Sequence, residues 1–182
     1  SRCWFVSSGK VGYGTADAVA TIDYTGNPPV NGDYYFFDGI EFDIGQSDYL
    51  SLNNCKHFMF RNCTFRGDGV QRAGNNAGVG MGGNSTTDRL SDGVFYNCTV
   101  RDLGLWNPST PMGADIDVHG VSVGRFIERV WMLNSFFYQN QGDGIQITGG
   151  SPAENAVDDV REFYIQDCVF HSNLQNGWWH KL

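Results

Sequence analysis

The densest group of ionisable side chains in the sequence lies at residues 115–119, where Asp115, Asp117 and His119 alternate with apolar residues. Two carboxylates and an imidazole within five residues could carry out acid–base chemistry or hold a cation. The group closes a 16-residue stretch, 103–118, and a connection of this length in a compact domain is often functional. An ordinary solvated loop explains the two aspartates equally well. The question is therefore which elements position this stretch.

The composition favours one all-β domain. The chain has 182 residues, with 24 glycines, 14% aromatic residues and 18% charged residues. Short apolar and aromatic runs between Gly, Asn and Asp clusters are typical of strands and turns. A net charge of −8 argues against a nucleic-acid partner, and no apolar run is long enough to span a membrane. The five cysteines include no CxxC pair, which argues against zinc-finger or thioredoxin-like chemistry. This acidic composition favours a secreted protein.

One pattern occurs four times and is centred on an asparagine or aspartate. The copies are FMFRNCTFR (58–66), GVFYNCTVR (93–101), VWMLNSFFY (130–138) and FYIQDCVFH (163–171), with the central residues Asn62, Asn97, Asn134 and Asp167. Apolar residues alternate on both sides of the centre, so the flanks predict two short strands with apolar side chains pointing inward. Asparagine tolerates left-handed backbone angles, so we expect it at a sharp corner between the strands.

A second pattern alternates with the first. Its second residue is glycine and apolar residues mostly alternate after it, in DGIEFD (38–43), AGVGMG (77–82), HGVSVG (119–124), DGIQIT (143–148) and NGWWHK (176–181). Two patterns that alternate over several cycles predict a solenoid whose coils each hold several short strands. Adjacent coils lie about 4.8 Å apart, so the corner amides should hydrogen-bond along the axis.

The residue after each corner is small, which suits an inward-facing row: Cys63, Cys98, Ser135 and Cys168. Equivalent positions in neighbouring coils are close enough for a disulfide between Cys63 and Cys98. Stacked buried thiols are the simpler interpretation. A bridge between Cys3 and Cys55 is a third option.

These patterns resemble those of the right-handed parallel β-helix in the pectate-lyase-like superfamily, over residues 37–182. The resemblance implies an all-β, right-handed parallel β-helix of which four to five coils are visible. Residues 1–36 fit the repeat poorly and would form an initial coil or a covering segment. The chain ends within a strand of the second pattern, so we expect further coils, a partner chain or additional sequence to cover an uncapped end. Family members are mostly extracellular polysaccharide lyases, hydrolases and epimerases, together with phage tailspikes and adhesins.

In the family layout the glycine pattern is the first strand of each coil, and substrate lies along the outer face of that sheet. The resemblance therefore implies an outward, substrate-binding row on this face: Glu41, Gly80, Ser122, Gln146 and Trp179. Lys181 follows on the same face. An outward tryptophan in a groove suits stacking on a sugar ring, or it packs against a further coil.

Family enzymes that act on uronic-acid polymers neutralise a carboxylate, remove the C5 proton and then expel the leaving group or return a proton. The resemblance implies Ca²⁺ ligands or neutralising groups at Asp115, Asp117 and Asp143, and a catalytic base among His119, Arg72 and Lys181. The run from 115 to 119 is also loosely similar to the Asp-Pro-His-Asp motif of alginate epimerases, without its proline and final aspartate. A structural corner role for His119 is an alternative, because it shares its repeat position with Asp143.

Two functions from different classes fit these patterns. The first is an extracellular lyase or C5-epimerase acting on an acidic polysaccharide. The second is a non-catalytic β-helix in an adhesin, a surface fibre or a phage tailspike. The second sheet favours the latter, because its outward positions form an apolar stripe: Met59, Val94, Trp131 and Tyr164. Residues 1–36, the loop 149–162, further coils or a neighbouring chain in a homo-oligomer would cover that stripe.

The third sheet carries an outward row of cationic and aromatic residues: Arg66, Arg101, Tyr138 and His171. Such a row would attract an anionic polymer or simply face solvent. The sequence therefore predicts a polysaccharide partner on one or more outer faces, with Ca²⁺ as the candidate cofactor.

Overall fold

The computed structural model describes residues 3–6, 20–24, 29–30, 33–44, 50–70, 76–107, 109, 118–148, 160–175 and 177–180. For residues 3–6, 20–24, 29–30 and 178–180 it describes the backbone and not the side chains. The regular structure within these ranges consists of strands. These ranges hold no helix of the length and apolar character needed to cross a membrane.

The strands form three parallel sheets of six strands each. Sheet A contains β1 (Cys3–Val6), β4 (Tyr35–Asp38), β7 (Lys56–Arg61), β10 (Leu90–Tyr96), β13 (Ile127–Leu133) and β16 (Arg161–Gln166). Sheet B contains β2 (Ala20–Tyr24), β5 (Ile40–Ile44), β8 (Thr64–Arg66), β11 (Thr99–Arg101), β14 (Phe136–Tyr138) and β17 (Val169–His171). Sheet C contains β3 (Pro29–Val30), β6 (Leu50–Asn53), β9 (Asn76–Gly82), β12 (Val118–Val123), β15 (Ile145–Ile147) and β18 (Trp178–His180).

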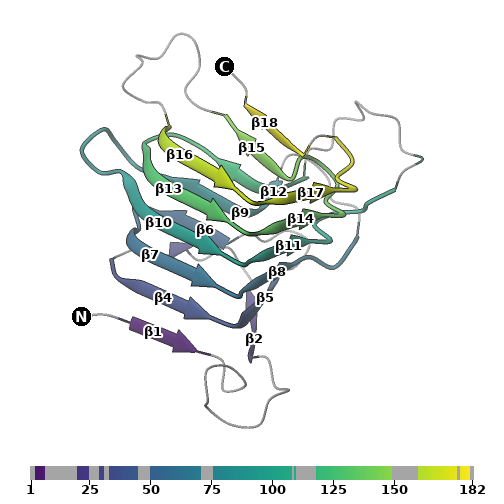
Figure 1. Ribbon diagram of the computed structural model, residues 1–182, viewed down its shortest axis with the longest axis horizontal. Coiled ribbons are helices and arrows are strands. Elements are labelled where there is room, and N and C mark those ends of the chain that lie inside the picture. The colour runs from purple at the N-terminus through teal and green to yellow at the C-terminus, as the bar shows by residue number, and fades with distance from the viewer. Residues whose placement is uncertain are drawn as a thin grey trace.

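The chain passes through sheets A, B and C in turn, so each strand lies beside the strand three places later in the chain (Figure 1). Each such circuit is one coil of a β-solenoid, and β1, β2 and β3 pair in parallel with the three strands of the next circuit. The predicted all-β class, the parallel strands and the repeated coils are therefore confirmed. Both strands of the asparagine pattern and the strand of the glycine pattern fall on separate sheets, which places one copy of each pattern in most coils.

The corner between sheets A and B is where the asparagine pattern turns the chain. Asn62, Asn97 and Asn134 have positive φ angles of 53°, 54° and 48°. The Nδ2 of Asn97 donates to the Oδ1 of Asn62 at 2.7 Å, and the Nδ2 of Asn134 donates to the Oδ1 of Asn97 at 3.3 Å. The predicted amide ladder is therefore confirmed. The ladder ends at Asp38, whose Oδ1 accepts a hydrogen bond from the Nδ2 of Asn62 at 2.8 Å.

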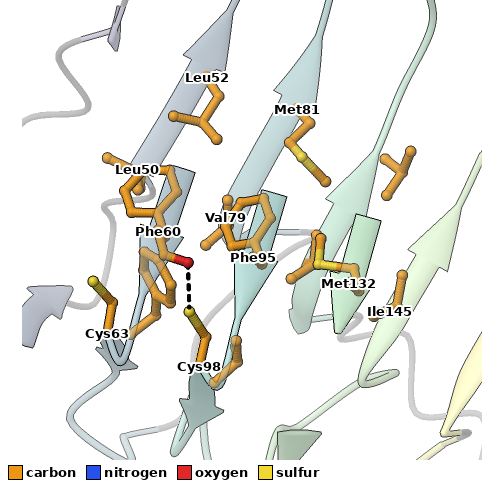
Figure 2. Close-up of a cluster of buried hydrophobic side chains, with 14 of the residues drawn as sticks. Leu50, Leu52, Phe60, Cys63, Val79, Met81, Phe95, Cys98, Met132 and Ile145 are labelled. Carbon is orange, nitrogen blue, oxygen red and sulfur yellow. Dashed lines mark hydrogen bonds between the residues drawn. The ribbon is translucent and has the colours of Figure 1, made fainter. Parts of the chain in front are cut away.

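The core consists of aromatic columns that run along the solenoid axis. Phe60 stacks on Phe37 at 4.9 Å and on Phe95 at 5.0 Å between ring centroids, and all three are buried. Figure 2 shows Phe60 and Phe95 of this column beside apolar side chains from sheet C, and Met132 continues the column in the next coil. Phe42 and Phe65 stack in the same way inside sheet B, at 5.1 Å. Each level repeats its neighbour's shape, so the aromatic rings of successive coils stack on one another along the axis.

The cysteine row lines the inside of the asparagine corner. Cys63, Cys98 and Cys168 are free thiols, and the first two are fully buried. The Sγ of Cys98 donates to the carbonyl oxygen of Phe60 at 3.4 Å, as Figure 2 shows, and the Sγ of Cys168 donates to that of Met132 at 3.4 Å. Stacked thiols, rather than a disulfide between Cys63 and Cys98, are therefore confirmed. They give the carbonyls next to the corner a weak donor.

The recurring glycine of the second pattern leaves room for the neighbouring coil. A Cβ atom on Gly120 would lie 2.4 Å from the carbonyl oxygen of Gly144, and one on Gly144 would lie 2.4 Å from that of Gly177. The same added atoms would meet Val100 at 3.2 Å and Phe170 at 2.8 Å. Any larger residue would therefore force the coils apart.

The segment DGIEFD (38–43) does not belong to the glycine pattern, contrary to the prediction. Its strand β5 pairs with β8 in sheet B, and Gly39, with φ of 68°, occupies the corner that asparagine occupies in the next coils. The true sheet C strand of this coil is β6, which pairs with β9. Glycine and asparagine both tolerate the left-handed angle, so an Asp-Gly pair fits either pattern.

Candidate functional site

The outer face of sheet C carries one row of residues in direct register. Gly80 pairs with Ser122, Ser122 with Gln146, and Gln146 with Trp179. This part of the predicted row is confirmed as an arrangement of the backbone. Ser51 completes it through its pairing with Gly80. Gln146 and Ser51 are buried, whereas Ser122 is half-buried.

Glu41 does not lie in this row, and that part of the prediction is wrong. It is on sheet B, in register with Thr64, and its Oε1 accepts a hydrogen bond from the Nε of Arg66 at 3.1 Å. Its position follows from the reassignment of segment 38–43 to the corner between sheets A and B.

At the start of β12 and just before β15, His119 and Asp143 form a buried pair on neighbouring coils. The Nδ1 of His119 lies 3.4 Å from the Oδ2 of Asp143, and the two side chains are 4% and 0% exposed. The Nε2 of Gln146 donates to the same Oδ2 at 3.5 Å. A carboxylate without exposure is costly unless it is paired, so these contacts fix where the Asp143 side chain can lie.

The local chain path explains why the imidazole fits there. Gly142 precedes Asp143, and a Cβ atom on it would lie 3.0 Å from the Nδ1 of His119 and 2.9 Å from the carbonyl oxygen of Val118. The amide of Gly142 donates to that same carbonyl at 2.7 Å. Glycine therefore allows the coil to close against the histidine ring.

The hydrogen bonds of His119 determine which nitrogen carries its proton. The backbone N–H of Asp143 donates to Nδ1 at 3.2 Å, so Nδ1 is an acceptor and the neutral imidazole carries its proton on Nε2. Within the part of the chain that the structure describes, Nε2 has no hydrogen-bond partner. Nε2 is therefore the ring nitrogen of His119 that can donate a hydrogen bond.

Two further asparagines, which the sequence patterns did not single out, support this region from the corner between sheets B and C. The Nδ2 of Asn140, which is fully buried, donates to the Oδ1 of Asn173 at 2.9 Å, and its Oδ1 accepts from the backbone N–H of Leu103 at 3.4 Å. Asn140 and Asn173 each follow a corner residue, Asn134 and Asp167, by six positions. That spacing is the signal by which they could have been found.

The beginning of the long connection 103–118 is held against the next coil. The Oε1 of Gln141 accepts a hydrogen bond from the backbone N–H of Leu105 at 2.9 Å, and the backbone N–H of Gln141 donates to the carbonyl oxygen of Leu103 at 2.8 Å. Gly104, with φ of 71°, lets the chain turn directly over Gln141. The connection therefore leaves from a fixed point beside the His119–Asp143 pair.

Several predicted site residues lie outside the described residues: Arg72, Asp115, Asp117 and Lys181. The backbone of Trp179 is described and its side chain is not. Among the described residues, no three His, Cys, Asp or Glu side chains cluster as metal ligands. Asp143 contacts nitrogen atoms of His119 and Gln146, and the Ca²⁺ site stays a prediction because its other two ligands, Asp115 and Asp117, lie outside the described residues.

The predicted cationic row on sheet B is in register but is neutralised by neighbouring acids. Arg66 binds the carboxylates of Glu41 and Asp43, at 3.1 and 2.9 Å, and hydrogen bonding to Glu41 raises the pKa of its guanidinium. Arg101 pairs with Asp102. This row therefore offers little net positive charge to an anionic polymer.

Comparison with protein-family models, with curated proteins and with solved structures finds no match to this chain.

Proposed function

We propose that the protein is an extracellular, right-handed parallel β-helix of the pectate-lyase-like type that binds an acidic polysaccharide across sheet C and acts on it as a lyase or C5-epimerase. The observation that carries the proposal is the His119–Asp143 pair, buried beside the in-register row Ser51, Ser122 and Gln146. Ser122, which is half-buried, is the hydroxyl of this row that an extended sugar chain can reach.

In this proposal His119 neutralises the uronate carboxylate of the substrate. Its Nε2–H donates to a carboxylate oxygen and stabilises the charge that develops there when the C5 proton leaves. The C5–H bond breaks, and its electron pair is delocalised into the carboxylate. In a lyase the C4–O bond then breaks to give a C4=C5 double bond, whereas in an epimerase C5 receives a proton on the opposite face. Arg72 and Lys181 remain the candidates for the base.

The test is incubation with alginate, polygalacturonate and other uronans in D₂O, with and without Ca²⁺. Deuterium at C5, measured by NMR, detects an epimerase, because C5 then receives a deuteron from solvent. A lyase leaves C5 without hydrogen and is detected by the ultraviolet absorbance of its C4=C5 double bond. We expect His119→Gln to lower the rate about 100-fold, as removal of one preorganised donor does elsewhere. His171→Gln is the matched control, because His171 stacks on Tyr138 on sheet B and should leave the rate unchanged.

Asp143→Asn separates the two roles open to His119. The backbone N–H at position 143 survives the substitution, so His119 keeps its proton on Nε2. If His119 acts as a neutral donor, the variant should therefore keep most of the reaction rate. If Nε2 instead acts as the base, the carboxylate is needed to stabilise the imidazolium. Asp143→Asn should then lower the reaction rate by a large factor. Absence of both deuterium at C5 and the ultraviolet absorbance of the double bond, with every uronan, would refute the enzyme proposal.

A non-catalytic β-helix that binds through its faces is the second candidate, and the exposed aromatic residues of sheet A favour it. Tyr96 and Tyr164 are 42% and 46% exposed on that face. Retention of the protein by an immobilised uronan, with neither deuterium at C5 nor the absorbance of a double bond, would support this function instead.

A further inference from the structure

The outer face of sheet A is organised in columns that run along the solenoid axis. The apolar column comprises Met59, Val94, Trp131 and Tyr164, in direct register on β7, β10, β13 and β16, and Phe36 on β4 extends it beyond Met59. The rings of Trp131 and Tyr164 stack at 5.6 Å with an angle of 12° between them. Figure 1 shows these strands side by side.

A charged column lies two residues before the apolar column. Its members share one left-handed position in each strand, with φ angles between 50° and 57°: His57, Asp92, Arg129 and Glu162. The Nε of Arg129 donates to the Oδ1 of Asp92 at 2.6 Å, and the Nδ1 of His57 lies 3.7 Å from the Oδ2 of Asp92. The charges therefore alternate along the axis, with histidine positive only when protonated.

We propose that this face binds a second copy of the chain, face to face, through a two-fold axis parallel to the strands. Such an axis reverses the order of the coils but keeps each column opposite its own counterpart. Val94 then faces Trp131 of the other copy, and Met59 faces Tyr164. The apolar column is thus buried against itself.

The charged column identifies a second copy as the occupant, because it is complementary to its own reverse. When the coil order is reversed, Asp92 faces Arg129 of the other copy and Arg129 faces Asp92. His57 and Glu162 face each other at the two ends. Opposite charges therefore meet at the two central levels at neutral pH, beside the apolar column.

The size of the face determines how tight this dimer can be. Four coils at about 4.8 Å and strands of six residues at about 3.3 Å give a face of about 19 by 20 Å, or about 800 Å² over both copies. That area lies below the roughly 1,200 Å² of stable complexes, so the expected dimer is weak and depends on concentration.

The test is sedimentation velocity of the wild-type chain from about 10 µM to about 1 mM, a range that covers weak interfaces. We expect the mean mass to rise towards that of a dimer, and Trp131→Glu to remain monomeric throughout. Phe136→Glu is the matched control, since Phe136 is 40% exposed on sheet B and should not alter association.

A charge exchange distinguishes contacts between copies from the ion pair within one copy. Asp92→Arg and Arg129→Asp each place like charges opposite one another in a homodimer, so each variant alone should stay monomeric. An equimolar mixture of the two variants sets a copy with two central arginines in this column against a copy with two central aspartates, and should dimerise. The double variant should dimerise as the wild type does, which checks that the exchanged charges still permit folding.

A wild-type chain that stays monomeric over the whole range would overturn the proposal, as would a dimer that survives Trp131→Glu. A mixture of single variants that fails to associate, while the double variant does associate, would overturn the two-fold arrangement. Binding of an oligosaccharide that perturbs Trp131 fluorescence in a chain that never self-associates would assign the face to a sugar instead.

Discussion

Gly120→Ala tests why glycine recurs in the second sequence pattern. The added Cβ would lie 2.4 Å from the carbonyl oxygen of Gly144, where ordinary contact begins at 3.4 Å, so the two coils must separate locally by about 1 Å. That carbonyl accepts the backbone N–H of Val121 at 3.0 Å, and the shift would weaken this buried hydrogen bond. Overpacking costs about 2 kcal/mol and the weakened bond about 1 kcal/mol, a total near 3 kcal/mol.

Thermal and urea unfolding measure this loss. For a chain of this size, about 3 kcal/mol corresponds to a fall in Tm of roughly 6–12 °C. Gly82→Ala is the matched control on the neighbouring coil, because the nearest atom to its Cβ is the carbonyl oxygen of Arg125 at 3.9 Å. That variant should be neutral or stabilised by up to about 1 kcal/mol, through the lower entropy of its unfolded chain. Equal stability of the two variants would refute the packing explanation.

Three further outcomes follow from the corners, the ion pairs and the buried thiols. Asn97→Ala should lose about 2 kcal/mol in urea unfolding, because alanine is strained at φ of 54° and the 2.7 Å bond to Asn62 is lost. Asn97→Gly loses the same hydrogen bond but is not strained at this φ, so its loss of stability should be smaller. Hydrogen bonding from Arg129 lowers the pKa of Asp92 below 3.8, so this pair stabilises the fold above that pH and ceases to do so as the pH falls through the lowered pKa. Arg129→Gln should therefore destabilise the protein at neutral pH and converge with the wild type in acid. Burial raises the pKa of Cys55 to about 12, so peptide mapping after iodoacetamide treatment should find it unlabelled in the folded protein and labelled in urea.

The sequence predicts those parts of the fold that every coil must repeat. The corner asparagines, the inward phenylalanines and the small residue after each corner recur because each level packs against the same shape above and below. Cys98 and Phe95, for example, are both buried where the alternation places them. Periodic constraints of this kind are visible in one sequence without any relatives.

The parts that the sequence does not predict depend on signals that fit more than one position. The Asp-Gly pair at 38–39 fits both patterns, and the choice between them moves Glu41 from sheet C to sheet B. The orientation of His119 is a different case. Its proton position depends on a backbone N–H from Asp143 on the next coil, a contact that residue types and spacing do not specify.

The columns also explain why the two proposals can be tested separately. Each outward side chain of a parallel solenoid lies on the outer face of a single sheet. A substitution on sheet A therefore alters the contacts of that face and leaves the register of sheet C unchanged. Trp131 and His119 lie on different sheets, β13 in sheet A and β12 in sheet C. Trp131→Glu should therefore abolish self-association without affecting the rate of reaction with uronans. His119→Gln should lower that rate and leave the sedimenting mass unchanged. If either substitution altered both properties, the site on sheet C would depend on the second copy, and the two faces would form one functional unit.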